Sequence, residues 1–166
     1  KYPKAGEKNS KVSVYVYDVS DRTTTKMDTG EEDDIYLPRI RWTQDPKKLA
    51  IIRLNRHQNK MEVLLANAKV GTIVPLYREE NKYYIDESNL DNLVFLDNGT
   101  QFVITSEKSG YMHFTISTDG KDKRLPKEIS ISLISTVMIL FANSSTILPT
   151  KNLHLKNTFI ALTKRD

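Results

Sequence analysis

The chain has 166 residues and a mass of 19.1 kDa, with 39% hydrophobic and 28% charged residues. This length suits one domain of ordinary size, and the composition excludes a disordered tail and a membrane protein. The chain has no cysteine, which excludes disulfides, thiolate zinc sites and cysteine nucleophiles. Its first residue is Lys1 rather than Met, so we expect an engineered piece, a processed product or a fragment.

The net charge of +4 is unevenly distributed along the chain. Residues 1–125 carry 20 basic and 19 acidic side chains, whereas residues 126–166 carry 5 and 2. Nucleic-acid binding usually requires clustered Lys and Arg with aromatic platforms, and the sequence contains neither. We therefore expect no nucleic-acid partner.

Residues 1–125 have the pattern of successive β-strands. Val12, Val14 and Val16 occupy every second position, as in a half-buried strand. Further strand-like runs are 49–54, 61–65, 101–105 and 111–117, and turn signals at Asp45-Pro46, Asn98-Gly99 and Asp119-Gly120 separate them. Because no segment of this part has a helical period, we predict an all-β fold.

The strands repeat with an offset of about 53 residues. The superposed pairs are Trp42 and Phe95, Asp45 and Asn98, Leu49 and Phe102, Ile51 and Ile104, Met61 and Phe114, and Val63 and Ile116. Such a period is typical of propeller blades, so we predict a partial β-propeller of two to three antiparallel blades. The expected units are the end of one blade at 1–29, a blade at 30–80 and a blade at 81–125. A sandwich of several hairpins is the alternative.

Four segments resemble segments of a known family, and they occur in the same order and with similar spacing as in that family. They are Tyr2–Asn9 (YPKAGEKN), Trp42–Thr43, Asn55–Asn59 (NRHQN) and Ser106–His113 (SEKSGYMH). Each resembles a segment of the N-terminal β-propeller of dipeptidyl peptidase IV-like serine peptidases of the prolyl oligopeptidase superfamily, most closely the bacterial members. The resemblance covers residues 1 to about 125.

The resemblance implies a longer parent enzyme. In this family an eight-bladed propeller caps an α/β-hydrolase domain that carries a Ser-Asp-His triad. The enzyme releases dipeptides from the N-termini of peptides and prefers proline or alanine at the second position. The family's amine-binding glutamates lie upstream of the first matching segment and its triad far downstream, so both fall outside this chain. The implied partners are peptide substrates and the hydrolase domain, with a homodimer as one arrangement. The implied location is the bacterial periplasm or cell surface.

The residues themselves predict no catalytic, cofactor or metal site. No serine lies in a G-x-S-x-G elbow, and no H-E-x-x-H, P-loop or dinucleotide motif occurs. Of the three histidines, His57, His113 and His154, we expect His113 to make a structural hydrogen bond within a blade. A small self-contained enzyme is thus disfavoured. A non-enzymatic propeller that binds a protein partner remains the alternative to the peptidase propeller. A hydrolase domain in the downstream sequence would indicate the peptidase, and its absence would indicate the binding module.

Four polar or aromatic clusters have both a functional and a structural interpretation, and we favour the structural one for each. We expect Glu31–Asp34 to form a solvated loop, because it lacks the alternating ligands of a calcium site. Glu79-Glu80 should lie in a loop and is not the amine-binding pair. We expect Tyr83-Tyr84 to serve packing, and Asn55–Asn59 to form a hairpin whose Asn and Gln side chains bond turn backbone groups.

The chain changes character at Pro126. All eight tyrosines, the single tryptophan and all six glycines precede it, and charged residues fall from 39 of 125 to 7 of 41. The apolar run Ile129–Ala142 is too short to span a bilayer. Codons permitted for the tail can be chosen so that restoring one base before codon 126 shifts the reading frame. Translation in the shifted frame then gives a sequence similar to that of the family. We therefore predict that 126–166 is translated out of frame and is not a native blade.

Overall fold

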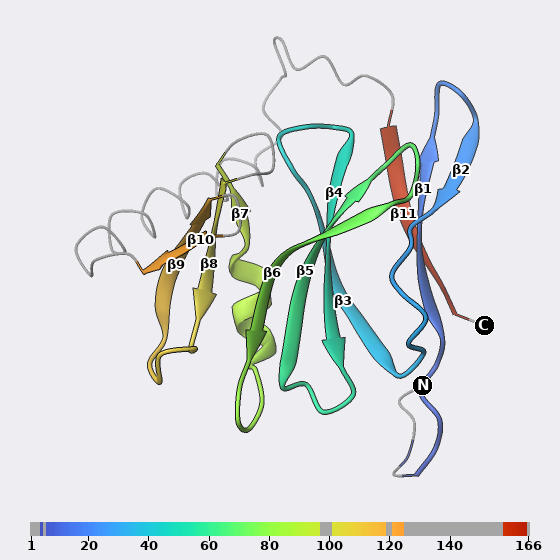
Figure 1. Ribbon diagram of the computed structural model, residues 1–166. Helices are drawn as coiled ribbons and strands as arrows, with labels where there is room; N and C mark the ends of the chain where they lie inside the picture. Colours follow the sequence, from blue (N-terminus) through green and yellow to red (C-terminus); the bar gives the residue numbers. More distant parts are fainter. Residues whose placement is uncertain (1–3, 5, 97–100, 119–120, 125–157, 166) are drawn as a thin grey trace.

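The computed structural model describes residues 4, 6–96, 101–118, 121–124 and 158–165. Strands dominate this part of the chain, and they form three antiparallel sheets placed side by side (Figure 1). The first sheet has the order β11-β1-β2, with β1 at Val12–Asp18, β2 at Thr23–Lys26 and β11 at Thr158–Arg165. The predicted all-β class is confirmed.

The second and third sheets each have four strands in chain order. The second consists of β3 (Ile35–Trp42), β4 (Lys48–Asn55), β5 (Lys60–Asn67) and β6 (Ile73–Glu80). The third consists of β7 (Val94–Phe95), β8 (Gln101–Ser106), β9 (His113–Thr118) and β10 (Lys121–Arg124). A 3-10 helix, η1 (Glu87–Asn92), connects the two sheets. The second and third sheets lie within the predicted units 30–80 and 81–125.

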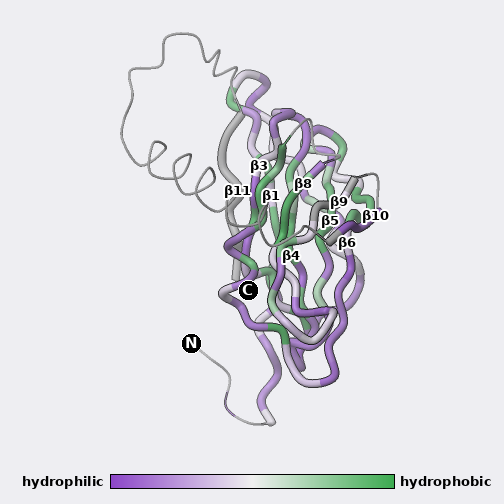
Figure 2. Tube along the Cα trace, turned by 90° about the vertical axis from the view of Figure 1, so that its left-hand side faces the viewer, coloured by the Kyte–Doolittle hydropathy of each residue, from purple (hydrophilic) through white to green (hydrophobic). Residues whose placement is uncertain are grey.

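The second sheet is buried on both of its faces. On one face Ile52 of β4 packs in a cluster with Phe102 of β8, and on the other Ile51 packs with Val14 of β1. All four of these side chains are fully buried. A strand that is buried on both faces has apolar residues at successive positions. This explains why apolar and polar residues do not alternate over 49–52. Figure 2 shows the hydrophobic stretches of β4 and β8 in the interior and hydrophilic residues toward the loops.

The strand register supports the internal repeat. Trp42 of β3 pairs with Leu49 of β4, and Phe95 of β7 pairs with Phe102 of β8, so these strands keep the offset of 53. Leu49 also pairs with Ala66, whereas Phe102 pairs with Ser117, which stands 51 positions after Ala66.

The superposition of Met61 on Phe114 and of Val63 on Ile116 was therefore wrong by two residues. Leu49 and its partner Ala66 are 17 positions apart, whereas Phe102 and its partner Ser117 are 15 positions apart, and a constant offset cannot follow that change.

The last strand of the chain extends the first sheet. β11 runs antiparallel to β1, with Val12 opposite Arg165 and Val16 opposite Ala161. Residues 125–157, which hold most of the predicted out-of-frame tail and the apolar run Ile129–Ala142, lie outside the described residues. The frameshift itself stays a prediction.

Candidate functional site

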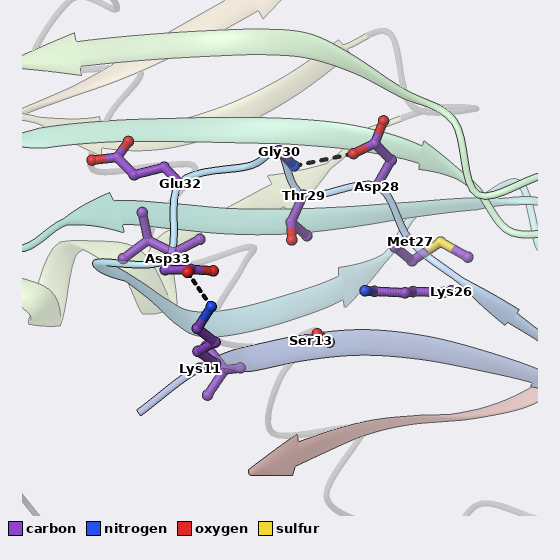
Figure 3. Close-up of a pocket in the computed structure, with 11 residues that line it drawn as sticks. Lys11, Ser13, Lys26, Met27, Asp28, Thr29, Gly30, Glu32 and Asp33 are labelled. Carbon is purple, nitrogen blue, oxygen red and sulfur yellow. Dashed lines mark hydrogen bonds and ion pairs between the residues drawn. The ribbon is translucent and has the colours of Figure 1, made fainter. Parts of the chain in front are cut away.

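Within the part of the chain that the structure describes, two polar cavities adjoin the second sheet. The larger, of about 510 Å³, lies between β1 and the segment that links β2 to β3, and Figure 3 shows Lys11, Lys26 and Asp33 among its lining residues. The smaller, of about 270 Å³, is lined by Arg53, Glu62 and other polar residues. The two cavities share Glu32 and Ile35. Charges of both signs line each cavity, so neither selects a ligand of one charge.

A three-residue ion cluster lies in the smaller cavity. Glu62 accepts hydrogen bonds from Arg53 Nε at 2.8 Å and from Arg78 Nε at 2.9 Å, one on each carboxylate oxygen. Burial raises the pKa of Glu62, but the hydrogen bonds from both guanidinium groups outweigh it and leave that pKa below its usual value. Arg53 Nη1 also donates to the Thr29 carbonyl at 2.7 Å. The cluster thus joins β4, β5 and β6 to the segment that follows β2.

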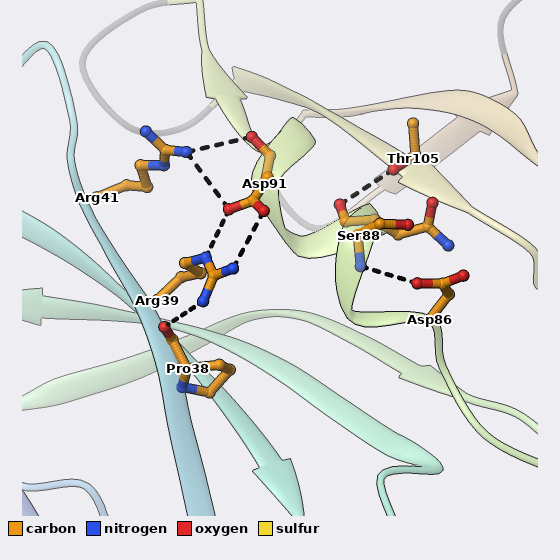
Figure 4. A network of polar contacts seen from close by, with 8 residues as sticks. Pro38, Arg39, Arg41, Asp86, Ser88, Asp91 and Thr105 are labelled. Carbon is orange, nitrogen blue, oxygen red and sulfur yellow. Dashed lines mark hydrogen bonds and ion pairs between the residues drawn. The ribbon is translucent and has the colours of Figure 1, made fainter.

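A second ion cluster joins the second sheet to η1. Figure 4 shows Arg39 and Arg41 of β3 pointing toward Asp91, whose Oδ2 accepts from Arg39 Nη2 at 3.1 Å. Arg41 Nη2 donates to the Asp91 carbonyl at 3.2 Å. The hydrogen bond from Arg39 is the main reason that the pKa of Asp91 lies below its usual value. These side chains are half exposed, so the cluster serves orientation more than stability.

The acidic run Glu31–Asp34 is exposed, in agreement with the prediction of a solvated loop. Asp33 forms an ion pair with Lys11, and Asp34 Oδ1 lies 3.5 Å from Arg56 Nη1. Among the described residues, no group of three or more metal-ligating side chains converges. Two carboxylates of the run therefore neutralise the charges of the neighbouring Lys11 and Arg56.

The prediction of a loop at Glu79-Glu80 was wrong. Both residues end strand β6, opposite Met61 and Lys60 of β5. Glu79 is only 2% exposed, whereas Glu80 forms an ion pair with Lys60 at 3.2 Å. The Glu79 carboxylate accepts hydrogen bonds from the Tyr77 hydroxyl and the Glu107 amide, and a sequence pattern does not reveal such bonds.

Tyr83 and Tyr84 do not pack as we expected. Their side chains are 73% and 64% exposed. Main-chain bonds hold their loop instead, because Asn81 N donates to Asn59 O at 2.9 Å and Ile85 N donates to Gln58 O at 2.7 Å. The loop thus presents two aromatic rings to solvent from a fixed backbone.

The segment Asn55–Asn59 forms the predicted hairpin. Asn55 Oδ1 accepts from Asn59 N at 3.0 Å and from Lys60 N at 2.9 Å, which satisfies two turn amides. Gln58 has a φ of 56°, in the left-handed region. Gln58 bonds through its backbone: its amide donates to the Asn55 carbonyl, and its carbonyl accepts from the Ile85 amide.

The pair Ser109 and His113 is one that the sequence analysis did not single out. Ser109 Oγ lies 3.3 Å from His113 Nδ1, and the same nitrogen lies 2.8 Å from the Tyr111 carbonyl oxygen. A carbonyl can only accept, so Nδ1 carries the hydrogen and cannot take a proton from Ser109. The contact is a turn bond, as expected for His113. His57 is exposed, and His154 lies outside the described residues.

Comparison with known proteins agrees with this architecture. The family model described as the dipeptidyl peptidase IV (DPP IV) N-terminal region matches residues 1–140. The chain belongs to this family. The crystal structure of Porphyromonas gingivalis dipeptidyl peptidase 4 is similar, with a TM-score of 0.69 and 36% identity over 76% of this chain. A putative dipeptidyl aminopeptidase IV from Bacteroides ovatus gives a TM-score of 0.67 and 28% identity over 76% of this chain.

Membership in the DPP IV N-terminal family identifies strands β1 to β10 as parts of a β-propeller, whereas β11 lies beyond the matched residues. The chain spans only 18% of the P. gingivalis protein and 21% of the B. ovatus protein, about a fifth of each. In the part of the chain that the structure describes, no helix is both long and apolar enough to cross a bilayer.

Proposed function

We propose that this chain is a non-catalytic propeller portion of a DPP IV-like serine exopeptidase that releases N-terminal dipeptides. The observation that carries the proposal is the burial of the second sheet between two neighbouring sheets, within a chain that the family model matches over residues 1–140. Each propeller blade requires such neighbours, because an isolated blade leaves its apolar faces open. In the parent enzyme this portion walls the substrate cavity.

Catalysis in this proposal belongs to other parts of the parent enzyme. The triad is expected downstream and the amine-binding glutamates upstream of this chain. Within the described residues, the one histidine that contacts a serine has its Nδ1 hydrogen directed at the Tyr111 carbonyl, so it is no general base for Ser109. The chain alone is expected to hydrolyse nothing.

The proposed partners and location follow from the family. The propeller portion packs against its own α/β-hydrolase domain and admits peptide substrates, and the parent enzyme forms a homodimer. The proposed location is the bacterial periplasm or cell surface. In the same proposal residues 1–29, 30–80 and 81–125 are blade units, and the tail at 126–166 is read out of frame.

Sequencing the encoding DNA from about codon 100 to well past the stop codon tests this proposal. If one extra base restores the frame and the reading continues into a hydrolase domain with a G-x-S-x-G elbow, the proposal is supported. If the tail is in frame and no shifted reading follows it, the tail is native and the peptidase proposal fails.

A non-enzymatic protein-binding propeller is the second candidate. The observation that favours it is the hairpin tip between β8 and β9, where Tyr111 is 80% exposed and Met112 65% exposed. Exposed aromatic and methionine side chains on a fixed turn are typical anchors of protein interfaces. Absence of a hydrolase domain in the gene would favour this candidate over the peptidase.

A further inference from the structure

Glu79 lies between the second and third sheets with its carboxylate out of solvent. The residue is 2% exposed and belongs to β6, the outer strand of the second sheet. Its Oε2 accepts from the Tyr77 hydroxyl at 2.8 Å, and its Oε1 accepts from the backbone amide of Glu107 at 3.2 Å. Glu107 begins the turn between β8 and β9, so the second bond crosses from one sheet to the next.

The donors to Glu79 are neutral groups. No lysine or arginine of the described residues lies within 4.0 Å of its carboxylate, in contrast to Glu62, which two guanidinium groups contact. Burying a carboxylate without a cation is costly, and hydrogen bonds must offset that cost. Burial, together with the adjacent Glu79, raises the pKa of Tyr77, so its hydroxyl keeps the hydrogen that it donates.

The two equivalent hairpins each combine local bonds with bonds to a neighbouring segment, but only the second receives a side-chain acceptor from the adjacent sheet among the bonds of the described residues. In the hairpin between β4 and β5, Asn55 Oδ1 accepts from the amides of Asn59 and Lys60, and the carbonyls of Asn59 and Gln58 accept from the amides of Asn81 and Ile85 in the segment that follows β6. In the hairpin between β8 and β9, Gly110 N donates to Glu107 O at 2.8 Å, which closes the turn. The bond that ties this second turn to the neighbouring sheet comes from Glu79.

We propose that Glu79 is a latch that fixes the 107–112 hairpin against β6 and thereby sets how Tyr111 and Met112 are presented to solvent. This inference goes beyond the proposed function, because it assigns a device to the fold whichever parent the chain belongs to. The apolar cluster between the sheets holds them together without specifying the hairpin position, since hydrophobic contacts are not directional. The hydrogen bond to Glu107 supplies the direction.

Amide hydrogen exchange of the 166-residue chain tests the latch, with Glu79→Met and Glu79→Gln as matched variants. Methionine removes the acceptor at similar volume, so we expect the Glu107 amide to exchange about tenfold faster or more. The Gln58 amide, which donates to the Asn55 carbonyl in the other hairpin, should keep its rate. Glutamine retains an acceptor oxygen, so the Glu79→Gln variant should keep the Glu107 amide protected.

A second measurement separates the latch from a general loss of stability. The methyl resonance of Met112 should show motional narrowing in Glu79→Met, whereas that of the buried Met61 should not. Asp91→Asn weakens the ion cluster between β3 and η1 and should leave the Glu107 amide protected. An unchanged Glu107 rate in Glu79→Met, or equal acceleration at Gln58, would overturn the proposal. Should Glu79→Met fail to fold, loss of protection at Glu107 in Glu79→Gln would overturn it as well.

Discussion

Gly71, in the turn between β5 and β6, lies directly against the backbone carbonyl of Lys26 in β2. A Cβ atom at Gly71 would stand 2.2 Å from the Lys26 oxygen. The Gly71 carbonyl in turn accepts a hydrogen bond from Asp28 N at 2.8 Å. This close approach fastens the first sheet to the second at the end opposite the Asn55–Asn59 turn, and only a residue without a side chain permits it.

Gly71→Ala should therefore destabilise the chain strongly. Its φ of +83° costs an alanine about 1–2 kcal/mol, and the clash with the Lys26 carbonyl adds about 1–3 kcal/mol. Gly110→Ala is the control, because Gly110 has a φ of +92° but nothing within 4 Å of an added Cβ. Urea denaturation of both variants checks this, and equal losses of unfolding free energy would show that the contact with β2 does not matter.

Arg53→Met should cost much more unfolding free energy than Arg78→Met. Arg53 is 21% exposed and bonds both Glu62 and the Thr29 carbonyl, so its loss should cost about 2 kcal/mol. Arg78 is 71% exposed and bonds the same carboxylate from solvent, so its loss should cost about 0.5 kcal/mol. Thermal or urea denaturation of the two variants measures the difference. A larger loss for Arg78→Met would contradict the assignment.

Glu62 should make the stability of the chain depend on pH in the acid range. Its pKa is lowered in the folded state, so its contribution is present above the unfolded value near 4.5 and is lost as the pH falls through the folded value. Glu62→Gln should be less stable at pH 7 and should lose less stability between pH 5 and pH 3. Urea midpoints across that range check this. Parallel curves for the two proteins would argue against the cluster as the cause.

Tyr77 should make the chain less stable in alkali. Burial raises its pKa in the folded state, so its contribution is complete below the unfolded value of 10.0 and is lost as the pH rises above it. Tyr77→Phe removes a donor to Glu79 at a cost of about 1 kcal/mol at neutral pH. The variant should then lose less stability than the parent chain above pH 10. Denaturation midpoints from pH 8 to pH 11 test this, with Tyr83→Phe as the exposed control.

The sequence predicted the elements more reliably than their details. The apolar residues 49–52 and the alternation at Val12–Val16 mark β4 and β1, because burial on two faces or on one face selects apolar residue types at those positions. The repeat also followed from residue type, since equivalent strands bury equivalent side chains. It was two residues wrong in β9, because the chain between paired positions of β8 and β9 is two residues shorter than the chain between the equivalent positions of β4 and β5, and this length has no hydrophobic signature.

The residues whose surroundings were predicted wrongly depend on contacts between distant segments. Glu79 was expected in a loop, because the pair Glu79-Glu80 follows Leu76–Arg78, which was read as the approach to a loop. Its burial depends on an amide 28 residues away in the sequence, which no local pattern marks. Tyr83 and Tyr84 were expected to pack, but their loop is held through its backbone and their rings point to solvent.

By itself the sequence determined that the chain is all-β, that its strands repeat, and that it resembles the propeller of dipeptidyl peptidase IV-like enzymes. The type and spacing of residues along a single strand or turn determine these properties. The tertiary structure alone decided which charged groups are paired, which glycine lies against a neighbouring sheet, and how the two hairpins are anchored. Such contacts join separate sheets, and their energy depends on distance and direction, which a linear pattern does not carry.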